Sequence, residues 1–255
     1  MSYRSVFRPG LFAGQSVIVT GAGSGIGRCT AHELAALGAH VVLVGRTVAK
    51  LESVAAEIRA DGGDASPLAC DIRDEAAVQA AVAAALAARG RIHGLVNNAG
   101  GQFPASLGGI SAKGWQAVIA NNLTGGFLMA RECYNQCMRA HGGAIVNMLA
   151  DMWNGMPGMG HSGAARAGML NFTETAACEW APVRVNAVAP GWIETPLTAA
   201  LRADPERHAA IETRTALRRW GKPQDVVGGV LFLASPLAGY ITGTILPIDG
   251  GYLAV

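Results

Sequence analysis

Short apolar runs alternate with helical patterns along almost the whole chain. The runs are rich in Val, Ile and Leu, and the stretches between them carry apolar residues at helical spacing. Strands that are buried on both faces have this near-continuous apolar character, which is typical of a parallel sheet covered by helices. We predict strands at residues 16–20, 40–44, 66–70, 92–97, 144–148, 183–188 and 244–248. The pattern indicates an α/β domain of the doubly wound, Rossmann type, with helices on both faces of the sheet.

The composition fits one such domain over residues 1–255. Hydrophobic residues make up 51% of the chain and charged residues 15%, and the net charge of +2 comes from scattered residues of both signs. This charge pattern disfavours a nucleic-acid surface. We find no apolar run of the length of a signal peptide or a membrane span, and the last three residues are no peroxisomal address. We therefore expect a cytoplasmic protein that acts on a small molecule, with no nucleic-acid or membrane partner.

The cysteines indicate a reducing compartment. They are odd in number and lack the spacing of a zinc site, so we expect buried, reduced thiols and no metal. The five are Cys29, Cys70, Cys133, Cys137 and Cys178.

A glycine-rich turn follows the first predicted strand. Residues 20–27 read Thr-Gly-Ala-Gly-Ser-Gly-Ile-Gly and open a helix predicted over 28–37. Glycines here permit positive φ and bring backbone N–H groups to a pyrophosphate, and the helix N-terminus adds about half a positive charge. A plain glycine turn is the alternative, but the position between the first strand and a helix favours a dinucleotide. The candidate ligands in this turn are Gly21, Ser24, Gly25, Ile26 and Gly27.

Arg46 follows the second predicted strand, where an acidic residue would bind the ribose hydroxyls of NAD. An arginine can instead pair with a 2′-phosphate, so Arg46 favours NADP(H), although a solvated arginine at a helix start is the alternative. Later loops supply further candidates for the adenine, the adenosine ribose and the nicotinamide, and each is also compatible with an ordinary cap or turn. They are Asp71 and Ile72, then Asn98 and Gly100, and finally Pro190, Gly191, Ile193 and Thr195.

Together with three later segments, these motifs resemble the short-chain dehydrogenase/reductase family over essentially the whole chain. The segments are 184–191 (Arg-Val-Asn-Ala-Val-Ala-Pro-Gly), 240–243 (Tyr-Ile-Thr-Gly) and 249–251 (Asp-Gly-Gly). The resemblance implies a seven-stranded Rossmann-type domain, NAD(P)(H), and a homodimer or homotetramer. Residues 98–103, 110–115 and 161–168 are expected around the substrate. They are similar to the peroxisomal trans-2-enoyl-CoA reductase and, next, to 2,4-dienoyl-CoA reductases.

The catalytic set of that family is Asn, Ser, Tyr and Lys. Asn122 matches the asparagine, whereas the serine falls near Ala150, the tyrosine on Ser162 and the lysine on Arg166. The usual proton donor is thus missing, and loss of a positioned acid typically costs about 10²–10⁴ in rate. Hydride addition to an α,β-unsaturated thioester is less demanding, because hydrogen-bond donors can hold the resulting enolate.

In this interpretation Arg166 holds the nicotinamide ribose, Ser162 hydrogen-bonds the thioester oxygen and Asn122 orients a water. Packing on a helix face is the alternative for Ser162 and Arg166. His161 and Asp151 are the nearest titratable residues, and either could protonate the α-carbon. A helix-start histidine and a loop-capping aspartate are the alternatives for these two.

Three irregular stretches, 101–114, 151–160 and 194–221, follow strands at the ligand-binding edge of the sheet. We expect them to wall the pocket, with 194–221 covering the substrate. The part of the chain from 148 to 159, which overlaps the second of these stretches, is rich in Met, which indicates a pliant wall or an ordinary core or subunit contact. The residues concerned are Met148, Met152, Met156 and Met159, with Trp153. The covering segment carries cations that could meet coenzyme A phosphates or be plain surface charges. They are Arg202, Arg207, Arg214, Arg218, Arg219 and Lys222.

Three functions remain open. The first is an NADP(H)-dependent oxidoreductase that reduces the 2,3 double bond of an enoyl-CoA by hydride transfer to the β-carbon, with the acyl-CoA as its substrate. The second is a dehydrogenase of alcohols or aldehydes, for example acyclic terpenoids, that recruits Asp151 or Ser162 in place of the tyrosine. The third is a nucleotide-binding protein without turnover.

Overall fold

Seven parallel strands form one sheet in the order β3-β2-β1-β4-β5-β6-β7. The computed structural model describes residues 7–254. The strands are β1 (Ser16–Thr20), β2 (His40–Gly45), β3 (Asp64–Ala69), β4 (Gly94–Asn97), β5 (Ala144–Met148), β6 (Arg184–Pro190) and β7 (Ile245–Ile248). The predicted doubly wound α/β fold is thereby confirmed. The predicted domain also included residues 1–6 and 255, which lie outside the described residues.

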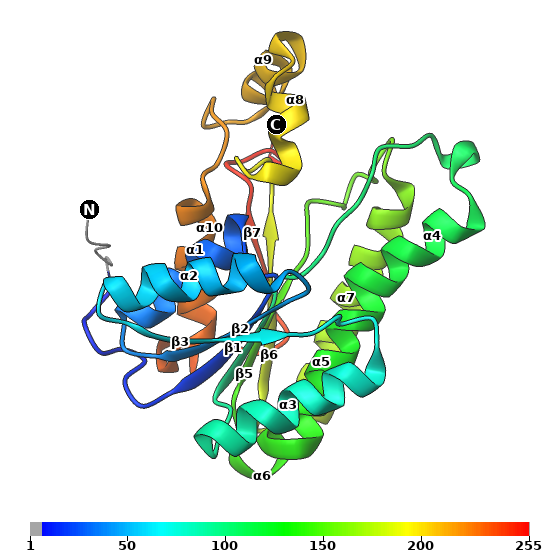
Figure 1. Ribbon diagram of the computed structural model, residues 1–255. Coiled ribbons are helices and arrows are strands. Elements are labelled where there is room, and N and C mark those ends of the chain that lie inside the picture. Colours follow the sequence, from blue (N-terminus) through cyan, green and yellow to red (C-terminus); the bar gives the residue numbers. More distant parts are fainter. Residues whose placement is uncertain (1–6, 255) are drawn as a thin grey trace.

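Helices cover both faces of the sheet (Figure 1). One face carries α1 (Gly25–Ala36), α2 (Val48–Ala60) and α10 (Pro223–Ala234), and the other carries α3 (Glu75–Arg89), α5 (Gly125–Cys133) and α7 (Gly160–Glu179). Shorter helices are α4 (Ala112–Ile119), α6 (Arg139–His141), α8 (Ala199–Arg202) and α9 (Pro205–Arg214). Single turns of 3₁₀ helix lie at Leu107–Gly109, Pro196–Thr198 and Pro236–Ala238, and π turns at Ala120–Thr124 and Tyr134–Met138. Among residues 7–254 we find no helix with the length and hydrophobicity needed to span a bilayer.

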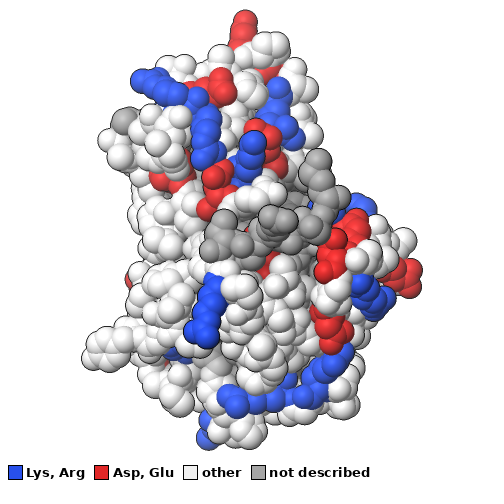
Figure 2. All heavy atoms as spheres, turned by 90° about the vertical axis from the view of Figure 1, so that its left-hand side faces the viewer, with Lys and Arg blue, Asp and Glu red and all other residues white. Residues whose placement is uncertain are grey.

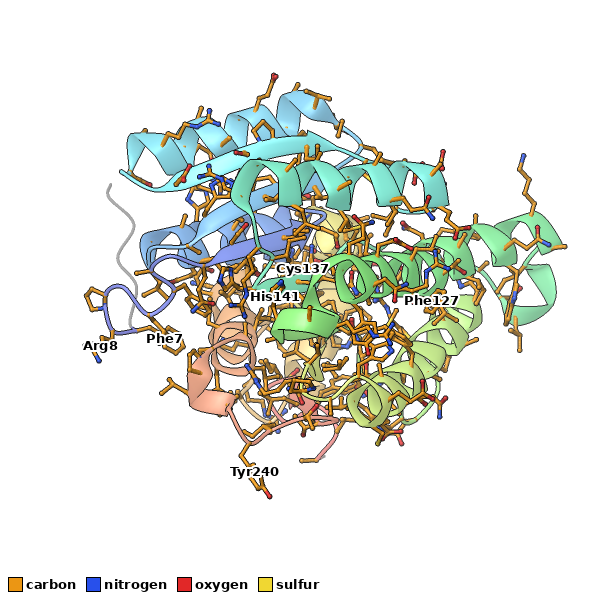
Figure 3. The ribbon with its side chains drawn as sticks, turned by 90° about the horizontal axis from the view of Figure 1, so that it is seen from below. Phe7, Arg8, Phe127, Cys137, His141 and Tyr240 are labelled. Carbon is orange, nitrogen blue, oxygen red and sulfur yellow. The ribbon has the colours of Figure 1, made fainter. Side chains whose placement is uncertain are left out.

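The strands are apolar throughout because both of their faces are buried. Val17 and Val19 of β1 pack in the core beneath α1, α2 and α10, whereas Ile18 between them packs in the core beneath α3, α5 and α7. Successive strand residues point to opposite faces, so two cores require a run without polar alternation. Figure 3 shows the side chains filling both layers, with Tyr240 pointing away from the body of the protein.

Two strands begin or end beyond their apolar runs. Asp64 pairs with His40 in the β2–β3 ladder, and Pro190 pairs with Ile248 in the β6–β7 ladder. Backbone pairing therefore extends β3 and β6 by two residues that hydrophobicity did not indicate. The stretch 194–221 is also more regular than predicted, since it contains α8 and α9.

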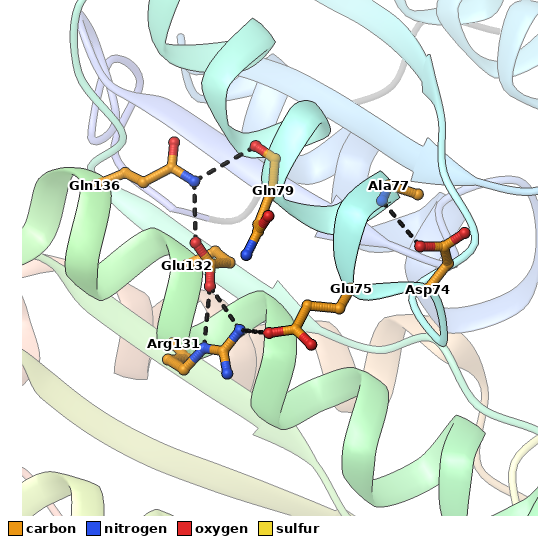
Figure 4. A network of polar contacts seen from close by, with 7 residues as sticks. All are labelled: Asp74, Glu75, Ala77, Gln79, Arg131, Glu132 and Gln136. Atoms are coloured by element: carbon orange, nitrogen blue, oxygen red, sulfur yellow. Dashed lines mark hydrogen bonds and ion pairs between the residues drawn. The ribbon is translucent and has the colours of Figure 1, made fainter.

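Charged side chains of both signs are interspersed on the face of the molecule that Figure 2 shows. Between α3 and α5, the Arg131 guanidinium donates to Glu75 at 2.5 Å and to Glu132 at 2.8 Å, and Gln136 donates to the other Glu132 oxygen at 3.1 Å (Figure 4). Glu132 is buried. Its carboxylate is thus satisfied by its own helix, and the shared arginine links α5 to α3.

Candidate active site

The glycine-rich turn lies at the carboxyl end of β1 and depends on the absence of side chains. Gly21 has φ +65°, and a Cβ on Gly27 would stand 2.4 Å from the Gly21 carbonyl oxygen. The Asn98 amide donates to the Thr20 carbonyl at 2.9 Å and holds the turn from the neighbouring strand. This cradle fits a pyrophosphate, because its backbone N–H groups are free of bulky neighbours.

The adenosine end of the site is a hollow of about 180 Å³ between the ends of β1, β2 and β3. Arg46 and Lys50 line it, and neither makes an ion pair with any residue in 7–254. The Arg73 side chain bonds the Asp71 carboxylate and lowers the pKa of Asp71 to about 2. Asp71 is therefore already paired, and the two unpaired cations suit a 2′-phosphate.

A larger cavity of about 590 Å³ continues along the carboxyl edge of the sheet. Every predicted coenzyme residue except Gly27 lines one of these two spaces. In the larger one are Gly21, Ser24, Gly25, Ile26, Asn98, Gly100, Arg166, Pro190, Gly191, Ile193 and Thr195. In the smaller one are Arg46, Asp71 and Ile72, together with Gly21, Ser24 and Gly100.

Arg166 is a buried cation on the wall of the larger cavity. Only 8% of its surface is exposed, and its guanidinium donates to the Met148 carbonyl at 2.5 Å and to Asn122 Oδ1 at 3.3 Å. The Nε hydrogen has no partner, and no carboxylate of the described chain pairs with the group. Burial lowers the pKa of Arg166 to about 10, so the group is still charged at neutral pH. The cavity thus contains a positive charge without a counter-ion.

Asn122 sits in the π turn Ala120–Thr124, between α4 and α5, which presents its side chain toward the end of β4. Its amide donates to the Gly101 carbonyl at 2.9 Å and its oxygen accepts from the Gly101 N–H at 2.9 Å. The residue does not line the cavity. In this structure Asn122 fixes the loop after β4 and one edge of the Arg166 guanidinium.

Ser162 also lies behind the cavity wall. Its side chain is fully buried, and its hydroxyl donates to Gln102 Oε1 at 2.6 Å. Gln102 does line the cavity, and its Nε2 donates to no described residue. Because Ser162 occupies the amide oxygen, the amide hydrogens of Gln102 are left for a ligand. Sequence reasoning missed Gln102, although it lies in the segment 98–103 that carries the subgroup resemblance.

The two predicted titratable residues lie differently. His161 is fully buried, accepts the Ser162 N–H on Nδ1 at 2.9 Å and packs against the edge of Phe103, with Nε2 unpartnered. Asp151 lines the cavity. Burial and then the negative charge of Asp249 raise the pKa of Asp151 above its usual range. Asp151, and not His161, is therefore placed to exchange a proton with a bound substrate.

The loop after β5 and the covering segment complete the wall. Met148, Met156 and Met159 line the cavity, whereas Met152 packs against a small core cluster with Leu149 and Trp153 is 45% exposed. From the covering segment, the cavity is lined by Thr195, Pro196, Leu197, Thr198 and Arg214.

The cations of the covering segment are not equivalent. Four of the six are held by groups of the same chain. These contacts are Arg202 with Glu194 and the Thr195 carbonyl, Arg207 with Asp204, Arg218 with the Thr213 carbonyl, and Arg219 with Asp225. Lys222 does not line the cavity. Tyr252, which sequence reasoning did not single out, does line it and lies under the Arg214 guanidinium.

Comparisons with known proteins place the chain in a family. A family model described as enoyl-(acyl carrier protein) reductase matches residues 21–253. A peroxisomal 2,4-dienoyl-CoA reductase of Pongo abelii is 37% identical over 98% of this chain and 87% of its own length. A 3-oxoacyl-[acyl-carrier-protein] reductase of Synechocystis is 40% identical over 93% of this chain and 96% of its own.

Solved structures give the same result. A citronellol catabolism dehydrogenase of Pseudomonas aeruginosa has a TM-score of 0.88 and 59% identity, covering 98% of this chain and 99% of that one. A protein of Beutenbergia cavernae, provisionally described as an NAD(P)-dependent gluconate 5-dehydrogenase, contains NADP at low occupancy. It has a TM-score of 0.92 and 40% identity, covering 97% of this chain and all of that one. The chain belongs to the short-chain dehydrogenase/reductase family and is an NAD(P)-dependent oxidoreductase.

Replacement of Arg46 by Asp is expected to weaken NADPH binding by about 10–100-fold, since a charge-assisted pair becomes a repulsion at the 2′-phosphate. NADH lacks that phosphate, and the new carboxylate can accept hydrogen bonds from its ribose hydroxyls, so its dissociation constant should stay the same or fall. Fluorescence titration of both coenzymes measures the effect, with NADH as the internal control. Equal loss for the two coenzymes would show that Arg46 does not contact the 2′-phosphate.

Proposed function

We propose that this protein is an NADPH-dependent reductase of α,β-unsaturated acyl thioesters, with an enoyl-CoA as substrate. The observation that carries this proposal is the buried guanidinium of Arg166, which pairs with no carboxylate of residues 7–254, on the same cavity wall as the Gln102 amide, with Ser162 where a phenol is usual. A cation and a neutral donor stabilise an oxyanion. They do not supply a proton as a phenol does.

The chain's own residues account for most of the work in this scheme. When bound, the reduced nicotinamide supplies the hydride that reaches the β-carbon. Arg166 holds the nicotinamide ribose and makes the cavity positive, and Gln102 donates to the thioester oxygen as negative charge develops there. Ser162 orients Gln102 by donating a hydrogen bond to its amide oxygen. Asn122 fixes the loop after β4 and one edge of the Arg166 guanidinium.

The α-carbon still needs a proton, and Asp151 is the donor that the structure favours. Its carboxyl lines the cavity, and burial keeps more of it protonated near neutral pH than an exposed aspartate would be. His161 is enclosed behind the wall and would need a path through Ser162 and Gln102. Water is the other available donor.

A second candidate is a dehydrogenase of acyclic terpenoid alcohols or aldehydes. It is favoured by the 59% identity to a citronellol catabolism dehydrogenase and by the three methionines that line the cavity. Thioether side chains adapt to branched chains. In that reaction Asp151 or Tyr252, both on the cavity wall, would have to replace the missing phenol.

Two expectations from the sequence stay proposals beside this function. We propose a homodimer or homotetramer, which the family resemblance supports, and we also propose a cytoplasmic location.

The two functions differ in substrate and in the direction of coenzyme turnover. We expect NADPH absorbance to fall when crotonyl-CoA or a longer enoyl-CoA is added, and no NADP⁺ reduction with citronellol. The reverse result, turnover of the alcohol only, would establish the second candidate. NADPH binding without either activity would leave a nucleotide-binding protein.

Replacement of Gln102 by Leu is expected to lower kcat for the enoyl thioester by about 10²–10³-fold, the usual loss for one oxyanion donor. Ser162→Ala should act in the same direction but more weakly, because Gln102 keeps its amide and loses only its orientation. Steady-state kinetics measures both, and unchanged NADPH affinity in each variant confirms an intact coenzyme site. A larger loss in Ser162→Ala than in Gln102→Leu would mean that Ser162 acts on the substrate directly.

The pH dependence of kcat tests Asp151. Only the protonated carboxyl can donate, so kcat should be constant at low pH and fall as pH rises through the raised pKa of Asp151. Asp151→Asn should remove this decline and lower kcat by about 10²-fold. If the variant keeps both the rate and the profile of the parent enzyme, water is the donor.

A further inference from the structure

The wall of the larger cavity holds a cation that the mechanism above does not use. Arg214, at the end of α9, lines this cavity together with Tyr252 from the C-terminal turn. Figure 1 shows α9 and the end of the chain beyond the carboxyl ends of the strands.

The Arg214 guanidinium is held by stacking and not by a carboxylate. Its Cζ atom lies 4.7 Å from the centre of the Tyr252 ring, and the Trp192 ring packs edge-on against Tyr252 at 6.4 Å. Within residues 7–254 no hydrogen bond or ion pair involves the Arg214 side chain. An aromatic ring holds a guanidinium by its face, so the N–H groups at the edge of the plane stay free to bind.

Neither Asp249 nor Asp151 neutralises Arg214. Asp249 accepts the backbone N–H groups of Gly251 and Leu253 at 3.0 and 2.9 Å, which commits it to the C-terminal turn. Asp151 feels the charge of Arg214 but forms no ion pair with it. The other arginines of the covering segment have partners on their own chain. Among the arginines of that segment, Arg214 is thus the one that lines the cavity and whose N–H groups have no partner within residues 7–254.

We infer that Arg214 binds an anionic group of the substrate, with Tyr252 as its positioning residue. This inference rests on the proposed function, since it names a feature of the substrate in the same cavity. A phosphate of an acyl-CoA and a carboxylate on the acyl chain both offer paired oxygens to a guanidinium fork. In either case Arg214 recognises a group of the substrate that does not take part in the reaction.

The kinetic test uses three substrates that separate the two sources of the anion. They are crotonyl-CoA, the N-acetylcysteamine thioester of crotonate, which has no phosphate, and the corresponding thioester of glutaconate, which adds a carboxylate. Arg214→Gln should raise KM by about tenfold for the substrate that carries the recognised anion, with kcat unchanged, as expected for loss of a charge-assisted hydrogen bond that acts equally in ground and transition states. An effect on crotonyl-CoA alone identifies the phosphate, and one on the glutaconyl thioester alone identifies the carboxylate.

Arg207→Gln is the matched control. Arg207 lies on the same helix and the substitution removes the same charge, but its side chain is 65% exposed, pairs with Asp204 and does not line the cavity. Equal KM increases in the two variants would show that the effect comes from the loss of a positive charge and not from a contact with the substrate. This result would overturn the inference. Tyr252→Phe keeps the stacking ring and should bind like the parent enzyme, whereas Tyr252→Leu should reproduce part of the Arg214→Gln effect without adding to it in the double variant.

Direct binding separates this inference from the proposed reaction. Tryptophan fluorescence of the NADPH-bound protein, for which Trp192 is a nearby probe, reports titrations with free coenzyme A and with glutarate. Arg214-dependent binding of either one, without reduction of any thioester, would support the inference and remove the proposed function. Reduction of all three thioesters with the same KM in the parent protein and in Arg214→Gln would support the proposed function and overturn the inference.

Discussion

A positive charge buried without a counter-ion is the constraint on which this active site depends. Moving an ion from water into a protein costs several kcal/mol even after relaxation, so a buried guanidinium needs hydrogen bonds or a bound anion. Within residues 7–254, the Arg166 guanidinium donates only two hydrogen bonds, to the Met148 carbonyl at the end of β5 and to Asn122 in the π turn. Gly100 must lack a side chain, since a Cβ would stand 2.7 Å from both Arg166 Nη2 and Asn122 Oδ1. The end of β5, the π turn and the segment at Gly100 thus together hold the Arg166 guanidinium at the cavity wall.

This charge changes what the loss of the phenol means. With Ser162 at the usual tyrosine position, the alkoxide that would form from a ketone lacks the family's proton donor. An enolate instead delocalises its charge and needs only hydrogen-bond donors until its α-carbon is protonated. Ser162 alone would replace the phenol poorly, because its hydroxyl is short and buried. Its bond to Gln102 extends its reach, since the amide carries donor hydrogens to the wall. In the proposed function, this site would stabilise an oxyanion through Gln102 and leave protonation of the α-carbon to Asp151 or water.

The sequence was sufficient for the sheet, and the residues that it predicted for the coenzyme lie, apart from Gly27, along two cavities at one edge of that sheet. Both rest on backbone requirements, namely two buried faces for strands such as β1 and the absence of side chains at Gly21 and Gly27. The sequence could not predict contacts between side chains that are far apart along the chain. Ser162 and Gln102 are 60 positions apart, and no spacing rule links them. The sequence pattern also could not distinguish Arg214 from the other arginines of the covering segment. They differ in whether a carboxylate or carbonyl lies within reach in the folded protein.

Charge couples Asp151 to Arg214, and both residues line the cavity. The attraction of Arg214 lowers the pKa of Asp151, but burial and Asp249 outweigh it, so the net shift is upward. An anion bound to Arg214 would cancel that attraction and raise the pKa of Asp151 further. The substrate would then bind more tightly to the protein whose aspartate is protonated, because linkage between two sites is reciprocal. Recognition of a remote anion would in this way favour the protonation state that completes the reduction. An uncharged substrate of the same chain length would leave the aspartate closer to its ionised form.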